Sequence, residues 1–150
     1  MKKILFVAAL LAATFANALN IGDTTPAFEI QDQFEKKQTI KSDAKNIIVA
    51  GDRDASEVIR DYLLKKEKGF LESKNSYYVA DISGMPSLIT KFFALPKMRD
   101  YPFSILLVDE EQSKSFTKKE GQITVYSVEN GKVSNVKYIT TAEELDAVFN

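Results

Sequence analysis

The chain has 150 residues, of which 45% are hydrophobic, and it contains neither cysteine nor histidine. These two absences exclude thiol–disulfide exchange, peroxide reduction by a thiol, and metal binding through cysteine or histidine ligands. The 20 basic and 21 acidic residues give a net charge of −1. This balance argues against nucleic-acid binding, which requires clustered positive charge.

Residues 1–18 have the three parts of a secretory signal peptide. Lys2 and Lys3 precede an apolar run over residues 4–15, and an A-x-A site follows at residues 16–18. The run is shorter than the roughly 20 residues that span a bilayer, so we expect cleavage before Leu19 rather than a membrane anchor. The product, residues 19–150, is expected to be one periplasmic domain without a membrane span. It carries 18 basic and 21 acidic residues, a net charge of −3.

The first half of this domain alternates strands with one long helix. Residues 27–31 alternate apolar and polar side chains, which predicts a half-buried strand, and residues 38–40 are expected to return beside it after a turn. The continuous apolar run at 46–50 is typical of a strand covered on both faces. An amphipathic helix is expected from about residue 54 to 67, and a further strand over 77–82.

A second helix is expected over residues 87–95. Its spacing places Leu88, Phe92 and Phe93 on one side, which we assign to the core together with Leu95, and Pro96 is expected to end the helix.

The last part of the chain predicts a buried strand, a hairpin and a helix. The strand covers residues 103–108, and the Asn-Gly pair between 123–128 and 132–139 is a strong hairpin signal. Thr141 with Glu144 forms the pattern of a capping box for a C-terminal helix. The order of elements indicates a layered α/β domain.

Several segments resemble the thioredoxin superfamily, and within it the peroxiredoxin-like branch. The segment from Ile21 to Phe34 is similar to the family's G-x-x-x-P-x-F strand and D-x-x-G turn, with Glu35 in place of the turn glycine. Residues 101–107 resemble its F-P-then-strand segment, and residues 125–133 its F-L-I-D-x-x-G-x-V hairpin. The resemblance implies a three-layer thioredoxin-like fold, with a central mixed β-sheet flanked by helices.

The same resemblance places a redox slot in this chain that holds no cysteine. Family members carry the catalytic cysteine where the strand over 46–50 gives way to a helix, which here corresponds to residues 53–56. Ser56 has no histidine to activate it, so redox and nucleophilic chemistry are not expected. The family's cis-proline corresponds to Pro102 on a thioredoxin register, or to Gly121-Gln122 on a peroxiredoxin register. Small cysteine-free periplasmic proteins, the YtfJ-like group among them, resemble this chain more closely than any working peroxidase does.

Two polar clusters are candidates for binding. Asp52, Arg53, Asp54 and Ser56 follow a buried strand, at the edge where open α/β sheets bind ligands, and Arg53 suits a carboxylate or phosphate. The alternative is helix capping by Asp54 or Ser56.

The second cluster lies in the loop that the thioredoxin register turns toward the redox slot. Arg99, Tyr101 and Pro102, with Lys97 and Asp100, line a groove for an extended peptide or form an ordinary connector. The leading hypothesis is a non-catalytic module, monomeric or weakly dimeric and without cofactor. It binds a periplasmic protein, a peptide or a small anion.

Two other functions remain open. Asp52 and Asp54 form a D-x-D pair, as in Mg²⁺-dependent phosphatases that use an aspartate nucleophile, and the carboxylates at 109–111 offer further oxygen ligands. Alternatively, the hairpin over 123–139 recruits a partner by strand addition, which makes the protein a structural subunit.

Overall fold

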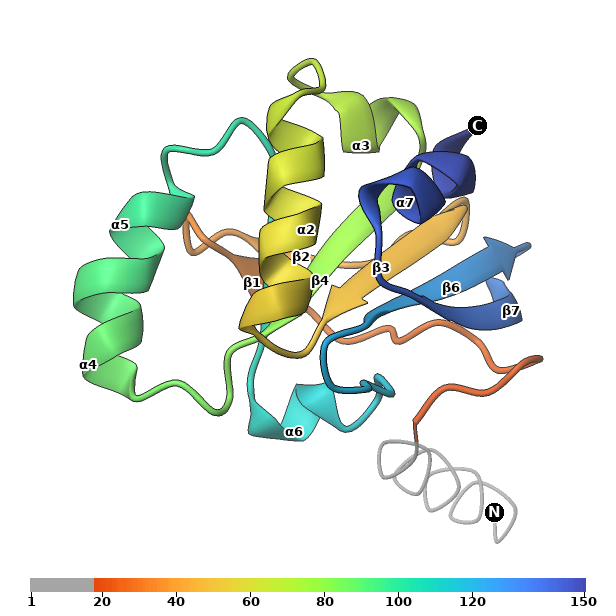
Figure 1. The fold of residues 1–150 in the computed structure, drawn as a ribbon. Helices are drawn as coiled ribbons and strands as arrows, with labels where there is room; N and C mark the ends of the chain where they lie inside the picture. Colours follow the sequence, from red (N-terminus) through yellow and green to blue (C-terminus); the bar gives the residue numbers. More distant parts are fainter. Residues whose placement is uncertain (1–17) are drawn as a thin grey trace, which may run out of the picture.

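The computed structural model describes residues 18–150 and shows one mixed β-sheet with helices packed around it (Figure 1). The predicted signal peptide lies outside the described residues, except for Ala18. The strands run in the order β2-β1-β5-β4-β3-β6-β7. They are β1 (Ile30–Asp32), β2 (Lys37–Gln38), β3 (Asn46–Ala50), β4 (Ser76–Asp81), β5 (Leu106–Val108), β6 (Ile123–Glu129) and β7 (Lys132–Ile139).

The helices are mostly short. They are α2 (Arg53–Leu64), α3 (Phe70–Ser73), α4 (Ser87–Ile89), the π-helix η2 (Thr90–Ala94), α5 (Leu95–Met98), α6 (Glu110–Ser113) and α7 (Ala142–Phe149). Strands β3, β4 and β5 run parallel to one another. On one side of this group β1 pairs antiparallel with β5, and on the other side β6 pairs antiparallel with β3. The predicted thioredoxin-like α/β architecture with a mixed sheet is therefore confirmed.

Each face of the sheet buries its own apolar layer. The helices α2, α3 and α7 cover one face, where Ile48, Ile59 and Leu145 are fully buried. The other face is covered by the segment after Leu19, by residues 39–44 and by Phe116, which follows α6. Burial of these two apolar layers stabilises the fold, and the sequence has no cysteine that could form a disulfide.

The C-terminal hairpin forms as its Asn-Gly pair predicts. Asn130 and Gly131 both adopt positive φ, 53° and 77°, and Glu129 pairs with Lys132 across the turn. A two-residue loop requires positive φ to match the twist of the strands that it joins. Thr141 caps α7 by accepting a hydrogen bond from the amide of Glu144.

At the β1–β2 turn, Glu35 occupies a backbone conformation that normally favours glycine. Glu35 takes φ of 64°, the left-handed conformation that favours the glycine of a D-x-x-G turn. Asp32 closes the turn, since its Oδ1 accepts hydrogen bonds from the amides of Phe34 and Lys36.

The prediction for residues 87–96 was wrong in two respects. Pro96 does not end the helix, which continues to Met98. The preceding turn widens to π geometry, so that the Leu95 amide bonds the Thr90 carbonyl and the helix accommodates the proline ring. Leu88, Phe92 and Phe93, assigned to the core, are 67%, 62% and 69% exposed. Helical spacing shows which side chains share a face, but not that the face turns inward.

Candidate functional site

Asp52 holds together the two sides of the predicted redox slot. It is the N-cap of α2, where its Oδ1 accepts a hydrogen bond of 3.0 Å from the Ala55 amide. Its Oδ2 accepts a bond of 2.6 Å from the amide of Gly121, at the position of the peroxiredoxin register. The carboxylate therefore caps the helix and also ties it to the loop before β6. The N-cap of α2 is therefore Asp52, and not Asp54 or Ser56 as the capping alternative proposed.

Next to this bridge lies a half-buried ion pair that the sequence analysis did not identify. Lys118 Nζ is 3.2 Å from Asp81 Oδ2, and the side chains are 24% and 12% exposed. Lys118 also donates to the Ser113 carbonyl at 2.8 Å, and its stem fills the space that a Cβ on Gly51 would need. The sequence offered Asp81, at the end of the strand predicted over 77–82, but nothing in the sequence pairs it with Lys118, which lies far away in the chain.

Arg53 and Asp54 form the exposed part of the first turn of α2. The Arg53 side chain is 89% exposed, and its Nε lies 3.0 Å from Glu57 Oε1. That carboxylate is the one partner recorded for this guanidinium among residues 18–150.

Ser56 turns inward instead. It hydrogen-bonds the hydroxyl of Tyr78, whose pKa burial raises to about 12, an effect that the Ser56 bond opposes. Tyr101 lies beside Arg60, and both residues are neighbours of Tyr78. Ser56 and Tyr101 therefore border one buried tyrosine, on the helix-covered side of the sheet.

The loop that carries Arg99 and Pro102 does not face the redox slot. It precedes β5, and since β5 runs parallel to β4, the loop reaches the amino end of these strands, whereas Asp52 follows the carboxyl end of β3. Pro102 is trans, as are all described peptide bonds. The structure therefore follows the peroxiredoxin register. It separates Arg99 and Pro102 from Asp52, whereas Ser56 and Tyr101, one from each cluster, both lie next to Tyr78.

Gln33 fastens this loop in place. It is fully buried, donates to the Phe103 carbonyl at 2.7 Å and accepts from the Ile105 amide at 2.8 Å. Arg99 Nε in turn donates to the Gln33 carbonyl at 2.8 Å. These bonds support the connector alternative for Arg99, and no local sequence pattern predicts them.

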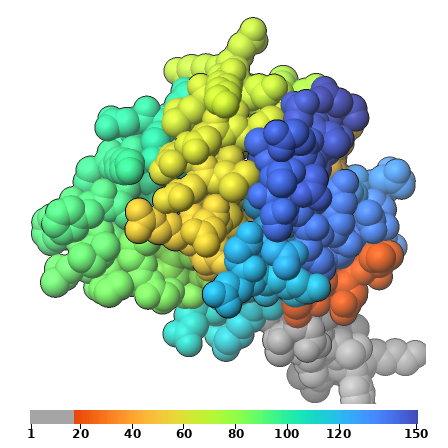
Figure 2. Space-filling model, viewed as in Figure 1, coloured from red at the N-terminus to blue at the C-terminus, as the bar shows by residue number. Residues whose placement is uncertain are grey.

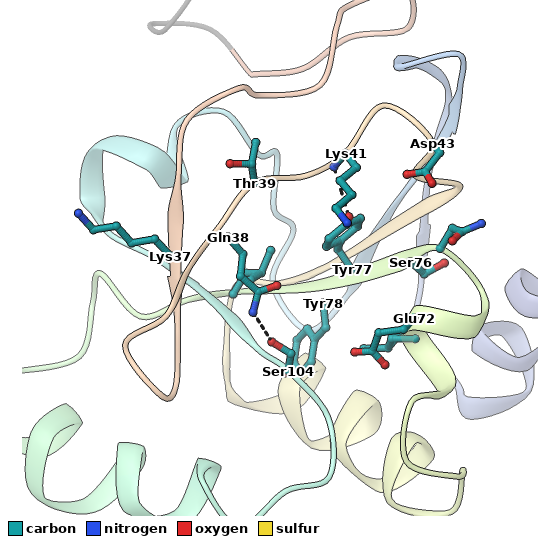
Figure 3. Close-up of a pocket in the computed structure, with 13 residues that line it drawn as sticks. Lys37, Gln38, Thr39, Lys41, Asp43, Glu72, Ser76, Tyr77, Tyr78 and Ser104 are labelled. Carbon is teal, nitrogen blue, oxygen red and sulfur yellow. Dashed lines mark hydrogen bonds between the residues drawn. The ribbon is translucent and has the colours of Figure 1, made fainter.

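A groove of about 540 Å³ lies near the amino ends of β4 and β5 (Figure 3). Lys41 and Asp43 line its rim in Figure 3, and Gln38 donates to the Ser104 hydroxyl across it. Charges of both signs border it, and none of the predicted binding residues lines it. Within residues 18–150, no group of three or more acidic side chains is placed to hold a metal ion.

The fold is thioredoxin-like, and Asp52 joins the start of α2 to the loop before β6. Solved structures with this fold include a thio-disulfide isomerase from Thermus thermophilus. It is 21% identical with a TM-score of 0.52, and the match covers 87% of this chain and 95% of the other. No family model matches the sequence, and neither does any curated protein.

Two further solved structures share this fold. Peroxidoxin BcpB from Mycobacterium tuberculosis is 16% identical with a TM-score of 0.52, over 87% of this chain and 94% of the other. The thioredoxin domain of a thiol-disulfide oxidoreductase from Bacteroides vulgatus is 16% identical with a TM-score of 0.54, over 89% and 100%. At these identities the likeness shows the fold alone.

Proposed function

We propose that this protein is a redox-inactive binding module of the periplasm, secreted by a cleaved signal peptide and free of cofactor. It acts as a monomer or weak dimer, and Arg53 anchors an acidic group of a protein, a peptide or a small anion. The observation that carries the proposal is that two neighbouring residues at the start of α2 have different surroundings. Asp52 supports the fold, whereas the neighbouring guanidinium is 89% exposed.

The chemistry of this turn favours an anionic partner. A guanidinium offers paired donors that match the two oxygens of a carboxylate or phosphate. The start of a helix adds favourable partial positive charge. Glu57 holds only Nε, so a partner's carboxylate can bind the Nη groups without breaking that contact.

The phosphatase alternative receives less support from the geometry. A nucleophilic aspartate needs a free oxygen directed at phosphorus, but both oxygens of Asp52 accept backbone hydrogen bonds. The hairpin alternative is also weaker, because residues 22–25 already bond the start of β7 at Gly131 and Val133. Strand addition there is restricted to the remainder of the edge.

Amide chemical shifts of labelled residues 19–150, titrated with a polyglutamate peptide, test the proposal. We expect shifts at Arg53, Asp54 and Glu57, and their loss in Arg53→Ala but not in Lys65→Ala, which removes an exposed cation at the other end of α2. A polyglutamine peptide is the uncharged control. Identical shifts in wild type and Arg53→Ala, or shifts confined to 123–139, would contradict the proposed site.

A further inference from the structure

The helical segment over residues 87–98 exposes a cluster of large apolar side chains, which we name the apolar ridge. Its members are Leu88 (67% exposed), Ile89 (45%), Phe92 (62%) and Phe93 (69%). A single exposed apolar residue is ordinary, but a contiguous cluster marks an interaction surface. In Figure 1, α4 and α5 lie apart from α3 and α7, and in Figure 2 the green segment forms one flank of the molecule.

The ridge is anchored on its inner side only. Leu95 and Met98 pack partly buried against the core, and Arg99 bonds the Gln33 carbonyl. No residue between 82 and 102 is buried. The anchoring fixes the segment on the domain and leaves its apolar side chains in solvent.

The charge of this segment is opposite to that of the domain. Lys91, Lys97 and Arg99 carry three positive charges, and no acidic residue occurs between Asp81 and Asp100. Residues 19–150 as a whole have 18 basic and 21 acidic residues, a net charge of −3. Lys91 Nζ lies 5.8 Å from the ring centroid of Phe92, so a cation adjoins the apolar cluster.

We infer that the apolar ridge docks on the surface of an anionic lipid bilayer. Phenylalanine rings and aliphatic side chains inserted among acyl chains, with lysines at the headgroup level, are the features of an interfacial helix. Within the described residues, no helix is long and apolar enough to cross a membrane, and the inferred contact requires none. The inference is independent of the site at Arg53.

A second copy of the chain fits this surface less well. A two-fold contact through the ridge would bring Lys91, Lys97 and Arg99 close to their own copies, with no acidic side chain in the segment to neutralise them. A bilayer that contains anionic phospholipid provides both the apolar phase and the opposite charge.

Vesicle binding by residues 19–150, which contain all the described strands and helices, tests the inference. The protein has no tryptophan, so Phe92→Trp provides a single reporter whose emission shifts to the blue when the ridge enters lipid. We expect this shift, and co-sedimentation, with vesicles of equal phosphatidylglycerol and phosphatidylcholine. Pure phosphatidylcholine should bind much less, and added salt should weaken the anionic case.

Two pairs of variants separate the apolar and the charged contributions. Phe92→Ser with Phe93→Ser is expected to weaken vesicle binding on the order of a hundredfold. Lys91→Gln with Lys97→Gln should weaken binding to anionic vesicles roughly thirtyfold and leave neutral vesicles unaffected. The matched apolar control is Ile21→Ser, since Ile21 is 64% exposed near the opposite edge of the sheet. The charge control is Lys65→Gln with Lys68→Gln.

Several outcomes would overturn the inference. They are the absence of binding to anionic vesicles, equal binding to both compositions, or equal losses in the Ile21→Ser control. Sedimentation velocity provides a further criterion. A concentration-dependent dimer abolished by Phe92→Ser with Phe93→Ser, without vesicle binding, would assign the ridge to self-association. Photocrosslinking from position 92 to a protein, again without vesicle binding, would assign it to a protein partner.

Discussion

Replacing Asp52 by asparagine separates the two hydrogen bonds that this side chain accepts. Asparagine caps helices as well as aspartate does, so its oxygen can keep the bond to the Ala55 amide. Its amide nitrogen then faces the Gly121 N–H, donor against donor. A hydrogen bond to a charged group contributes about 1.5–3 kcal/mol, so we expect Asp52→Asn to lower the free energy of unfolding by about 2 kcal/mol. Asp52→Ala also removes the cap and should cost about 1 kcal/mol more.

Urea unfolding followed by far-ultraviolet circular dichroism measures this loss. With a denaturant slope of about 2 kcal/mol per molar, the Asp52→Asn midpoint should fall by roughly 1 M. The matched control is Asp54→Asn, which removes an exposed carboxylate from the same turn and should cost no more than about 0.5 kcal/mol. If Asp52→Asn unfolds within about 0.5 kcal/mol of wild type, or if both variants lose equally, the bridge does not stabilise the slot.

Three further changes test other parts of the structure. Glu35→Gly should raise the free energy of unfolding by about 0.5 kcal/mol. Glycine adopts the positive φ of this position without strain, and this gain outweighs the extra entropy that glycine gives the unfolded chain. A urea titration that shows a decrease of about 0.5 kcal/mol instead would contradict this prediction. Tyr78 is protonated in the fold, with a pKa raised by burial to about 12, so its contribution to stability is complete below pH 10 and is lost toward pH 12. Thermal midpoints should fall less over this range in Tyr78→Phe, and parallel curves would refute the assignment. Phe92→Ser with Phe93→Ser should leave the unfolding midpoint nearly unchanged, whereas Phe116→Ala, at a buried site, should cost about 3–5 kcal/mol. A large loss in the double variant would show that the ridge packs against the fold.

Structural features that depend on residues close together in the sequence were predictable from it. The strand over 46–50 was predicted with its observed bounds, and the Asn-Gly hairpin and the cap at Thr141 appear where their patterns place them. Each depends on backbone conformation or burial periodicity within a few residues. The short helices α3 and α6 were missed, since single turns have almost no periodicity to detect.

Features that join distant segments were not predictable. The bond from Gly121 to Asp52 and the bonds from Gln33 to residues 103 and 105 depend on which loops the sheet order brings together. The thioredoxin register places the family's cis-proline at Pro102, and the peroxiredoxin register places it at Gly121-Gln122. The parallel pairing of β4 and β5, which the sequence does not show, distinguishes the two registers. The face that the 87–98 helix turns toward the domain likewise depends on the residues against which it packs, and these come from other segments of the chain.

The start of α2 depends on a carboxylate that the fold holds in place. Asp52 accepts one backbone N–H with each of its two oxygens, so neither oxygen is left unbonded to act as a nucleophile. The exposed groups are Arg53, in the first turn of α2, and the apolar side chains of the 87–98 segment. They differ in chemistry, one a single guanidinium and the other an apolar cluster with basic neighbours. Because the two surfaces share no contact, the effects of variants at Arg53 and at Phe92 on stability and on binding should be additive, and a departure from additivity would show that the two surfaces are coupled.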